Sequence, residues 1–262
     1  MTLPLSNRNA LVCGSTQGIG RACAVEFARL GAHVVLVGRN GDGLSNVFAE
    51  LPRPAQQEHG TLLVDFADWK AVEQVGNDHA TAHGPVHILL NNTGGPPAGA
   101  LFDASGDDLV KAFQMHIVCA QVLARAVAPG MRDAGYGRIM NIVSTSVVTP
   151  IRGLGVSNVV RAAMGNWMRT LAHELGPFGI TVNNILPGFT KTARLDSIFK
   201  GRASRAGTSV EEVEQEAMKT IPVRRLGTPE EIAAVAGFLA GPAAAYVNGV
   251  NLPVDGGRLA WQ

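Results

Sequence analysis

Residues 10–20 read Ala10-Leu11-Val12-Cys13-Gly14-Ser15-Thr16-Gln17-Gly18-Ile19-Gly20. An apolar run ends at Cys13, glycines follow in the spacing Gly-x-x-x-Gly-x-Gly, and an amphipathic stretch, Gly18–Leu30, comes next. Glycines at such a turn let the backbone come close to a pyrophosphate, and the first amides of a helix can donate to it. We therefore expect residues 14–20 to bind a dinucleotide. The plainer alternative is a strand–helix turn without a ligand.

The same alternation of strand and helix continues to the end of the chain. Short, mostly unalternated apolar runs predict strands at Ala10–Cys13, His33–Val37, Thr61–Val64, Val86–Leu90, Arg138–Val143, Ile180–Ile185 and Val250–Val254. Amphipathic stretches predict helices at Gly18–Leu30, Asp42–Leu51, Ala67–Ala82, Gly106–Ala128, Ser157–Leu175 and Pro229–Leu239. This pattern predicts an α/β fold, a Rossmann-type doubly wound parallel sheet of about seven strands with helices on both faces.

One polar segment, from Thr190 to Leu226, interrupts this rhythm between the sixth and seventh strands. Long insertions in compact domains are usually lids or binding loops. We therefore interpret residues 1–262 as a single domain in which residues 190–226 form a substrate lid. A pair of solvated surface helices is the alternative. The basic residues of this segment, mixed with apolar ones, would suit an acidic or acyl-like substrate.

The charge balance of the chain excludes some classes of partner. The 262 residues carry 22 Lys and Arg against 21 Asp and Glu, which gives a net charge of +1. That balance offers no electrostatic basis for binding nucleic acid or an anionic membrane. Charged residues make up only 16% of the chain, below the usual quarter or so. A low content of charged residues leaves more apolar surface exposed, and an oligomer would cover part of that surface.

The cysteines and the apolar stretches indicate where the protein works. Cys13, Cys23 and Cys119 are odd in number and lack Cys-x-x-Cys spacing, so we expect no disulfide framework and no metal site. Residues Met1–Ala10 do not resemble a signal peptide. The most apolar stretch, Ala233–Val247, is broken by glycines and a proline, so it does not predict a membrane span. We expect a soluble, cytoplasmic protein.

The end of the second predicted strand indicates which dinucleotide binds. NAD-binding folds place an acidic residue there, which binds the ribose hydroxyls. This chain reads Val37-Gly38-Arg39-Asn40 instead. No carboxylate would repel a 2′-phosphate, and the Arg39 guanidinium could hold it, so NADP(H) is favoured. The alternative is a solvated arginine at a strand end. Asp65, which closes the third strand, could accept from the adenine amino group.

Four further motifs follow in order over essentially the whole chain. They are Asn91-Asn92-Thr93-Gly94, Pro187-Gly188-Phe189-Thr190-Lys191-Thr192, Arg225-Leu226-Gly227-Thr228-Pro229-Glu230-Glu231-Ile232-Ala233 and Val254-Asp255-Gly256-Gly257. In these motifs the chain resembles the short-chain dehydrogenase/reductase superfamily, in the branch of bacterial 3-oxoacyl-carrier-protein reductases and related carbonyl reductases. The resemblance implies a homo-oligomer, a tetramer in many members. It also implies cofactor contacts from Phe66, Asn91, Gly94, Pro187, Gly188, Thr190 and Thr192.

The catalytic residues of that family are changed here. The family carries a Ser on the fifth strand, a Tyr thirteen residues later, a Lys four residues after the Tyr, and an Asn on the preceding helix. In this chain these places hold Ser144, Ser157, Arg161 and His116. We expect Ser144 and Ser157 to bind the substrate oxygen, and Arg161 to stabilise its charge and to anchor the cofactor ribose. His116 or water would then supply the proton.

Three interpretations of the activity remain open. The first is an NADP(H)-dependent oxidoreductase that interconverts a small-molecule carbonyl and its alcohol with this rearranged set. The second is a non-catalytic NADP(H)-binding sensor or partner subunit. The third is another reaction on the same scaffold, because halohydrin dehalogenases of this family also carry Arg at the Lys place, although they keep the Tyr. Each residue also has a plainer explanation: His116 as a core histidine, Ser157 as a small residue that leaves room.

Overall fold

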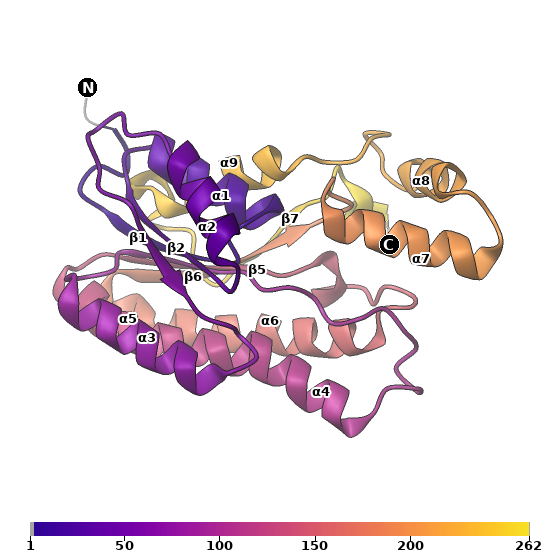
Figure 1. Ribbon diagram of the computed structural model, residues 1–262, viewed down its shortest axis with the longest axis horizontal. Coiled ribbons are helices and arrows are strands. Elements are labelled where there is room, and N and C mark those ends of the chain that lie inside the picture. Colours follow the sequence, from indigo (N-terminus) through magenta and orange to yellow (C-terminus); the bar gives the residue numbers. More distant parts are fainter. Residues whose placement is uncertain (1–2, 262) are drawn as a thin grey trace.

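A seven-stranded sheet forms the centre of the computed structural model, which describes residues 3–261 (Figure 1). The strands are β1 Asn9–Cys13, β2 His33–Gly38, β3 Gly60–Leu63, β4 Ile88–Asn91, β5 Gly137–Ile142, β6 Ile180–Pro187 and β7 Asn251–Val254. Their order is β3-β2-β1-β4-β5-β6-β7, and every neighbouring pair is parallel. The predicted doubly wound sheet is confirmed.

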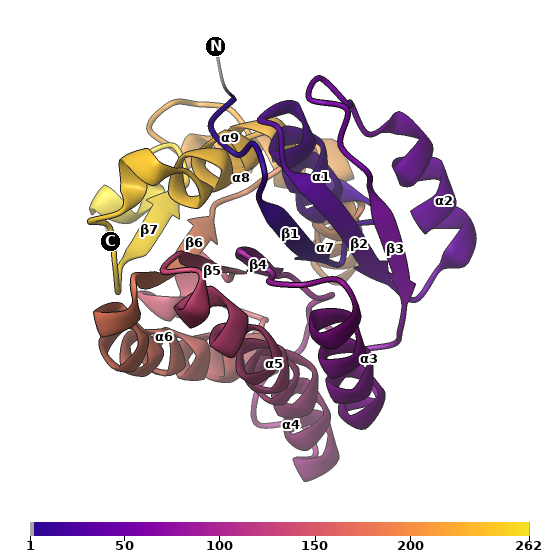
Figure 2. The same ribbon diagram turned by 90° about the vertical axis from the view of Figure 1, so that its left-hand side faces the viewer.

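Helices cover both faces of the sheet (Figure 2). One face carries α1 Gly18–Arg29, α2 Gly41–Glu50 and α9 Pro229–Ala240, and the other carries α3 Trp69–Ala82, α4 Gly106–Phe113, α5 Cys119–Asp133 and α6 Gly155–Leu175. Each face has its own apolar core, with Phe27 fully buried in the first and Met131 in the second. Within residues 3–261 no helix is both long and apolar enough to cross a membrane.

The predicted helix Gly106–Ala128 contains a turn that its periodicity does not show. Residues Gln114–Val118 form a π-helical turn between α4 and α5. Such turns shift the side chains that follow them around the helix axis and are frequent at functional sites. His116 lies in the middle of this turn, and its side chain is buried.

A row of three buried asparagines and one half-buried asparagine joins the four strands from β4 to β7. The Asn91 Nδ2 donates to the Asn141 Oδ1 at 2.9 Å, and the Asn141 Nδ2 donates to the Asn184 Oδ1 at 2.8 Å. The row ends where the Asn184 Nδ2 donates to the Asn251 Oδ1, also at 2.8 Å. These residues are direct register partners in the sheet. Since a one-residue slip would break the row, it fixes the alignment of the strands.

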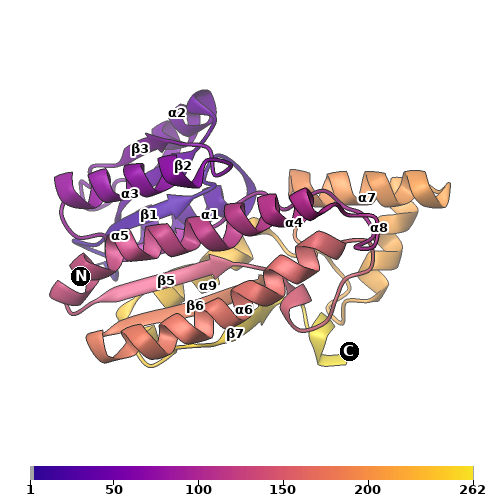
Figure 3. The same cartoon turned by 90° about the horizontal axis from the view of Figure 1, so that it is seen from below.

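The segment expected to be a lid forms two helices, α7 Ala193–Ala206 and α8 Val210–Lys219, which extend away from the sheet (Figure 1, Figure 3). They enclose a separate apolar cluster of Leu195, Phe199, Ala217, Ile221 and Leu226. The two ends of the segment meet in a bridge between Thr190 and Gly227, where the Lys191 N–H donates to the Gly227 carbonyl at 2.9 Å. The segment is therefore closed at its base.

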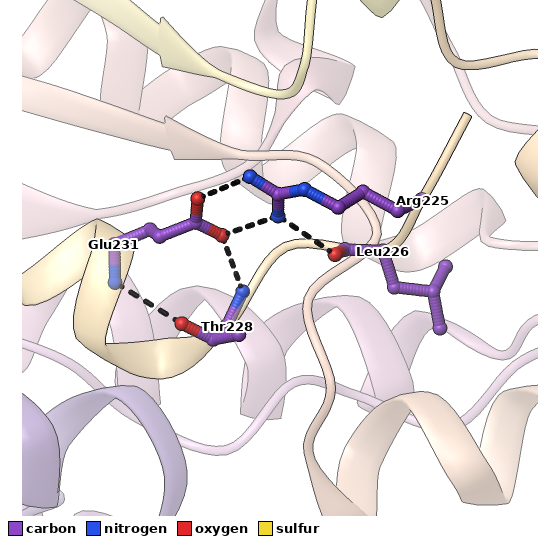
Figure 4. Close-up of polar contacts among 4 residues, drawn as sticks. All are labelled: Arg225, Leu226, Thr228 and Glu231. Carbon is purple, nitrogen blue, oxygen red and sulfur yellow. Dashed lines mark hydrogen bonds and ion pairs between the residues drawn. The ribbon is translucent and has the colours of Figure 1, made fainter. Parts of the chain in front are cut away.

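A second set of contacts holds the base of the segment to α9 (Figure 4). The Arg225 guanidinium donates to both oxygens of Glu231, at 2.8 and 2.6 Å, and the Thr228 N–H donates to the Glu231 Oε2 at 2.9 Å. These bonds, first from Arg225 and then from Thr228, lower the pKa of Glu231 to about 2. The carboxylate thus stays ionised at every physiological pH and caps α9.

Replacement of the central asparagine should destabilise the fold. Asn141→Leu would leave the Asn91 donor and the Asn184 acceptor buried without partners. Because each such group costs about 1–3 kcal/mol, we expect the free energy of unfolding to fall by at least about 2 kcal/mol in urea titrations. The control is Asn77→Leu on the exposed face of α3. Equal stability of the two variants would contradict the role of the row.

Candidate functional site

A cavity of about 900 Å³ lies at the carboxyl edge of the sheet. Its wall comes from loops that follow β1, β2, β3, β4, β5 and β6. The chain winds outward in opposite directions from β1 and β4, so these adjacent strands mark the point where the order reverses. Open α/β sheets bind their ligands in the crevice at this point. The cavity is thus where the fold predicts a ligand.

The glycine turn after β1 forms one wall of the cavity. Gly14 has a φ of +59°, and a Cβ there would lie 2.5 Å from the Asn92 carbonyl oxygen. A Cβ on Gly20 would lie 2.1 Å from the Gly14 oxygen, so both positions exclude a side chain. Helix α1 begins next to the turn, and its N-cap, Gln17, makes no side-chain capping bond. The first amides of α1 are therefore available to an anionic ligand.

Arg39 and Asp65 line the cavity beyond the turn, together with Phe66. The Arg39 Nη1 lies 3.5 Å from the Asp65 Oδ2, and 73% of the Arg39 side chain is exposed. An exposed ion pair at this distance contributes little to the free energy of folding, so Arg39 remains free to bind a phosphate. Arg21 from the first turn of α1 also lines this part and is paired with Glu50. Arg21 was not predicted from the sequence, although its place in the first turn of a helix after a glycine turn was a usable signal.

Ser144, Ser157 and Arg161 line the other part of the cavity. The Ser144 Oγ accepts from the Ser146 N–H at 3.1 Å, which leaves its own hydroxyl proton free to donate. Ser157 and Arg161 lie one turn apart on α6, and the Arg161 Nη1 donates to the Ile142 carbonyl at 2.7 Å. Burial, and then the neighbouring Arg194, lower the pKa of Arg161 to about 10, so the guanidinium is charged at neutral pH.

His116 lies behind this group and does not line the cavity. Its Nδ1 is 2.8 Å from the Thr93 Oγ1, and its Nε2 has no partner of hydrogen-bond geometry among residues 3–261. Burial, and then the charge of Arg161, lower the pKa of His116 to about 3. The imidazole is therefore neutral at physiological pH. It can orient a hydroxyl or a water molecule, but it does not hold an extra proton to give away.

The structure brings most of the predicted site residues to the same cavity. Those that line it are Gly14, Thr16, Gln17, Gly18, Ile19, Arg39, Asp65, Phe66, Gly94, Ser144, Ser157, Arg161, Pro187, Gly188, Thr190 and Thr192. Ser15, Gly20, Asn91 and His116 do not. Asn91 instead points into the asparagine row, and its neighbour Asn92 holds the glycine turn by donating to the Cys13 and Gly14 carbonyls at 3.3 and 3.1 Å.

Known proteins resemble this chain over nearly its whole length. Residues 14–258 match the family described as enoyl-(acyl carrier protein) reductase. The chain is 34% identical to the 3-oxoacyl-[acyl-carrier-protein] reductase of Pseudomonas aeruginosa, over 97% of this chain and 98% of the relative. Among solved structures, L-sorbose reductase from Gluconobacter frateurii complexed with NADPH and L-sorbose has a TM-score of 0.91, 32% identity and 99% coverage of both chains. An NADPH-dependent reductase involved in bacilysin biosynthesis has a TM-score of 0.90 and 27% identity, over 97% of this chain and 98% of that one.

Proposed function

The chain belongs to the short-chain dehydrogenase/reductase superfamily, and on that premise we propose that it interconverts a carbonyl and an alcohol with NADP(H), using Ser157 and Arg161 in the family's Tyr and Lys places. One observation carries the proposal. A single cavity has an uncapped helix start and a glycine turn in one part, and Ser144, Ser157 and Arg161 in another. One part suits a dinucleotide, and the other suits an oxygen that develops negative charge.

The residues present fit a bound dinucleotide phosphate. Gly14 lets the turn pack closely against Asn92, and the uncapped first amides of α1 beside it could donate to a pyrophosphate. Arg39 would take the 2′-phosphate of NADP, which agrees with the NADPH named for the two similar solved structures. Pro187, Gly188 and Thr192 would lie against the nicotinamide half, as their motif implies. When bound, the cofactor supplies or takes up the hydride.

The chain's own groups then act on the substrate oxygen. Ser144 and Ser157 donate hydrogen bonds to it, and Arg161 stabilises the charge that develops on it. Arg161 stays protonated and relays no proton. Because His116 is neutral, we propose that water delivers the proton and that Thr93, which lines the cavity and is hydrogen-bonded to His116, orients this water.

A non-catalytic NADP(H)-binding protein is the second candidate, and one observation favours it. Neither tyrosine of the chain lines the cavity, so no phenol can act as the acid. Tyr136 donates from its hydroxyl to the Ala240 carbonyl, and the Tyr246 side chain is fully exposed. A serine hydroxyl is a far weaker acid than a phenol. Measurable turnover of any carbonyl compound would exclude this candidate.

We further propose that residues 190–226 act as a lid over the substrate part of the cavity. The residues of this segment that line the cavity include Lys191, Arg194, Leu195, Ile198 and Arg202.

We also propose a cytoplasmic location for the protein. This location fits the three cysteines, Cys13, Cys23 and Cys119, which are free and buried.

The choice of cofactor can be tested at Arg39. Arg39→Ala removes the charge placed for a 2′-phosphate, so NADPH should bind about 10- to 100-fold more weakly while NADH affinity barely changes. Fluorescence titration of both cofactors checks this. The control is Arg29→Ala, which removes an exposed arginine of α1 that does not line the cavity. Equal losses for NADPH and NADH would refute the assignment.

The catalytic set can be tested by removing and by restoring groups. Ser144→Ala should lower NADPH oxidation with a ketone at every pH, because one donor to the oxygen is lost. The double variant Ser157→Tyr with Arg161→Lys restores a phenolic acid, and turnover should rise by up to about 10²- to 10⁴-fold. Steady-state rates of these variants and the parent are compared. Full parent activity in Ser144→Ala would place the reaction elsewhere.

The pH profile provides a separate check on His116. With a pKa of about 3, its imidazole is neutral from pH 5 to 8, and it becomes charged only as the pH falls toward 3. We therefore expect the pH profiles of the rate for the parent and for His116→Ala to have the same shape around pH 6.5. An inflection there in the parent that is lost in the variant would restore His116 as the proton donor.

Exposed apolar side chains favour a homo-oligomer, which we propose is a tetramer. Val110 and Phe113 on α4 and Val159 on α6 are 55%, 45% and 44% exposed. Large apolar residues gathered on neighbouring helices are typical of an interface. Light scattering at micromolar concentration should give the mass of four chains, and Val159→Glu should lower it. Leu63→Glu, at an exposed site on β3, is the control. A monomer mass for the parent would refute the proposal.

A further inference from the structure

The substrate part of the cavity carries an excess of positive charge. Four arginines line it: Arg161 from α6, Arg194 and Arg202 from α7, and Arg258 from the segment after β7. The carboxylates that line the cavity are Asp65, beside Arg39, and Glu230, at the start of α9. Within residues 3–261 none of these four arginines forms an ion pair. The cavity therefore holds unpaired cations where the substrate is expected.

Arg161 and Arg194 form the inner pair of these cations. The Arg194 guanidinium covers Gly95, where a Cβ would lie 3.2 Å from Nη2, and it donates to the Pro96 carbonyl. Burial lowers the pKa of Arg194, and burial followed by the charge of Arg194 lowers the pKa of Arg161. Two like charges that are partly removed from water repel each other. A bound anion between them would relieve this repulsion.

Arg202 and Arg258 form an outer pair around one ring. The Arg202 Cζ lies 5.8 Å and the Arg258 Cζ lies 4.7 Å from the centre of the Phe189 ring. The Arg258 Nε is buried and has no hydrogen-bond partner within residues 3–261. Stacking on an aromatic face leaves the donors at the edge of a guanidinium free. Because Arg202 belongs to the proposed lid and Arg258 to the segment after β7, the outer pair extends the positive wall across both segments.

The cofactor does not account for the inner pair. Its 2′-phosphate has Arg39, and its pyrophosphate has the first amides of α1. The ribose expected beside Arg161 is neutral. Arg194 has five N–H donors, of which one is engaged with Pro96, so it can still grip a planar anion.

We propose that the substrate is a carbonyl compound bearing a carboxylate, and that Arg194, assisted by Arg161, is the residue that recognises this anion. The inference rests on the proposed function and specifies its substrate class. A guanidinium binds a carboxylate through two parallel hydrogen bonds, which a neutral ketone cannot supply. A phosphate is also an anion that a guanidinium can bind through two hydrogen bonds, so a keto phosphate is tested beside the keto acid.

The experiment compares matched keto acids and their methyl esters, with NADPH in excess. The parent should prefer the acid. In Arg194→Gln, kcat/KM for the acid should fall about 10- to 100-fold, mainly through KM, while the value for the ester stays the same. Arg194→Lys should recover part of the loss. The control is Arg205→Gln, which removes an exposed charge from the same helix outside the cavity. NADPH affinity should be unchanged in all variants.

Four outcomes would overturn this inference. An equal loss for acid and ester would show that Arg194 only supports the loop at Pro96. A loss of NADPH affinity would assign Arg194 to the cofactor. Equal use of acid and ester by the parent would show that charge is not recognised. A parent that prefers the keto phosphate to the keto acid would replace the carboxylate by a phosphate.

Failure of the proposed function has a different signature. If no compound is turned over, calorimetry measures binding of a hydroxy acid and of its ester to the NADP⁺ complex. Binding of the acid that depends on Arg194 would then support the anion site while refuting catalysis. Acid and ester binding equally, or neither binding, would overturn the anion site as well.

Discussion

The amide hydrogen bonds from Asn91 to Asn251 fix the alignment of four parallel strands. The cavity loops that follow β4, β5 and β6 leave the sheet at positions set by that alignment. Ser144 follows β5, and the Pro187 motif ends β6. A shift of one residue in either strand would move its side chains to the opposite face. The geometry of the site therefore depends on a polar interaction within the sheet, below the cavity itself.

The sequence was sufficient for the fold because its signals are local and repeated. Each predicted strand has ends within two residues of those in the structure, since a buried parallel strand is a short continuous apolar run. The asparagine row and the π-helical turn at His116 were not predictable in this way. The row arises from contacts between segments far apart in the chain, and the π-helical turn is a local change of one backbone turn inside a continuous helical pattern.

The candidate site was predictable in its outline and less so in its chemistry. The spacing of the family motifs led to Ser144, Ser157 and Arg161, which share one cavity. The protonation state of His116 could not be predicted from the sequence, because it depends on burial and on the charge of Arg161, which lies on another helix. Asn92 was missed for a similar reason. Its motif was quoted, but only the packed structure shows which of the two asparagines holds the glycine turn.

The bridge between Thr190 and Gly227 brings the two ends of the helical insertion together. Because the entropy of closing the insertion depends only weakly on its length, residues can be added or removed beyond the bridge at little thermodynamic penalty. Such a change in the insertion would leave the structure of the sheet and of the glycine turn unaltered. Substrate preference can therefore change through replacement of this one compact segment. The glycine turn and Arg39, which are proposed to bind the cofactor, can stay as they are.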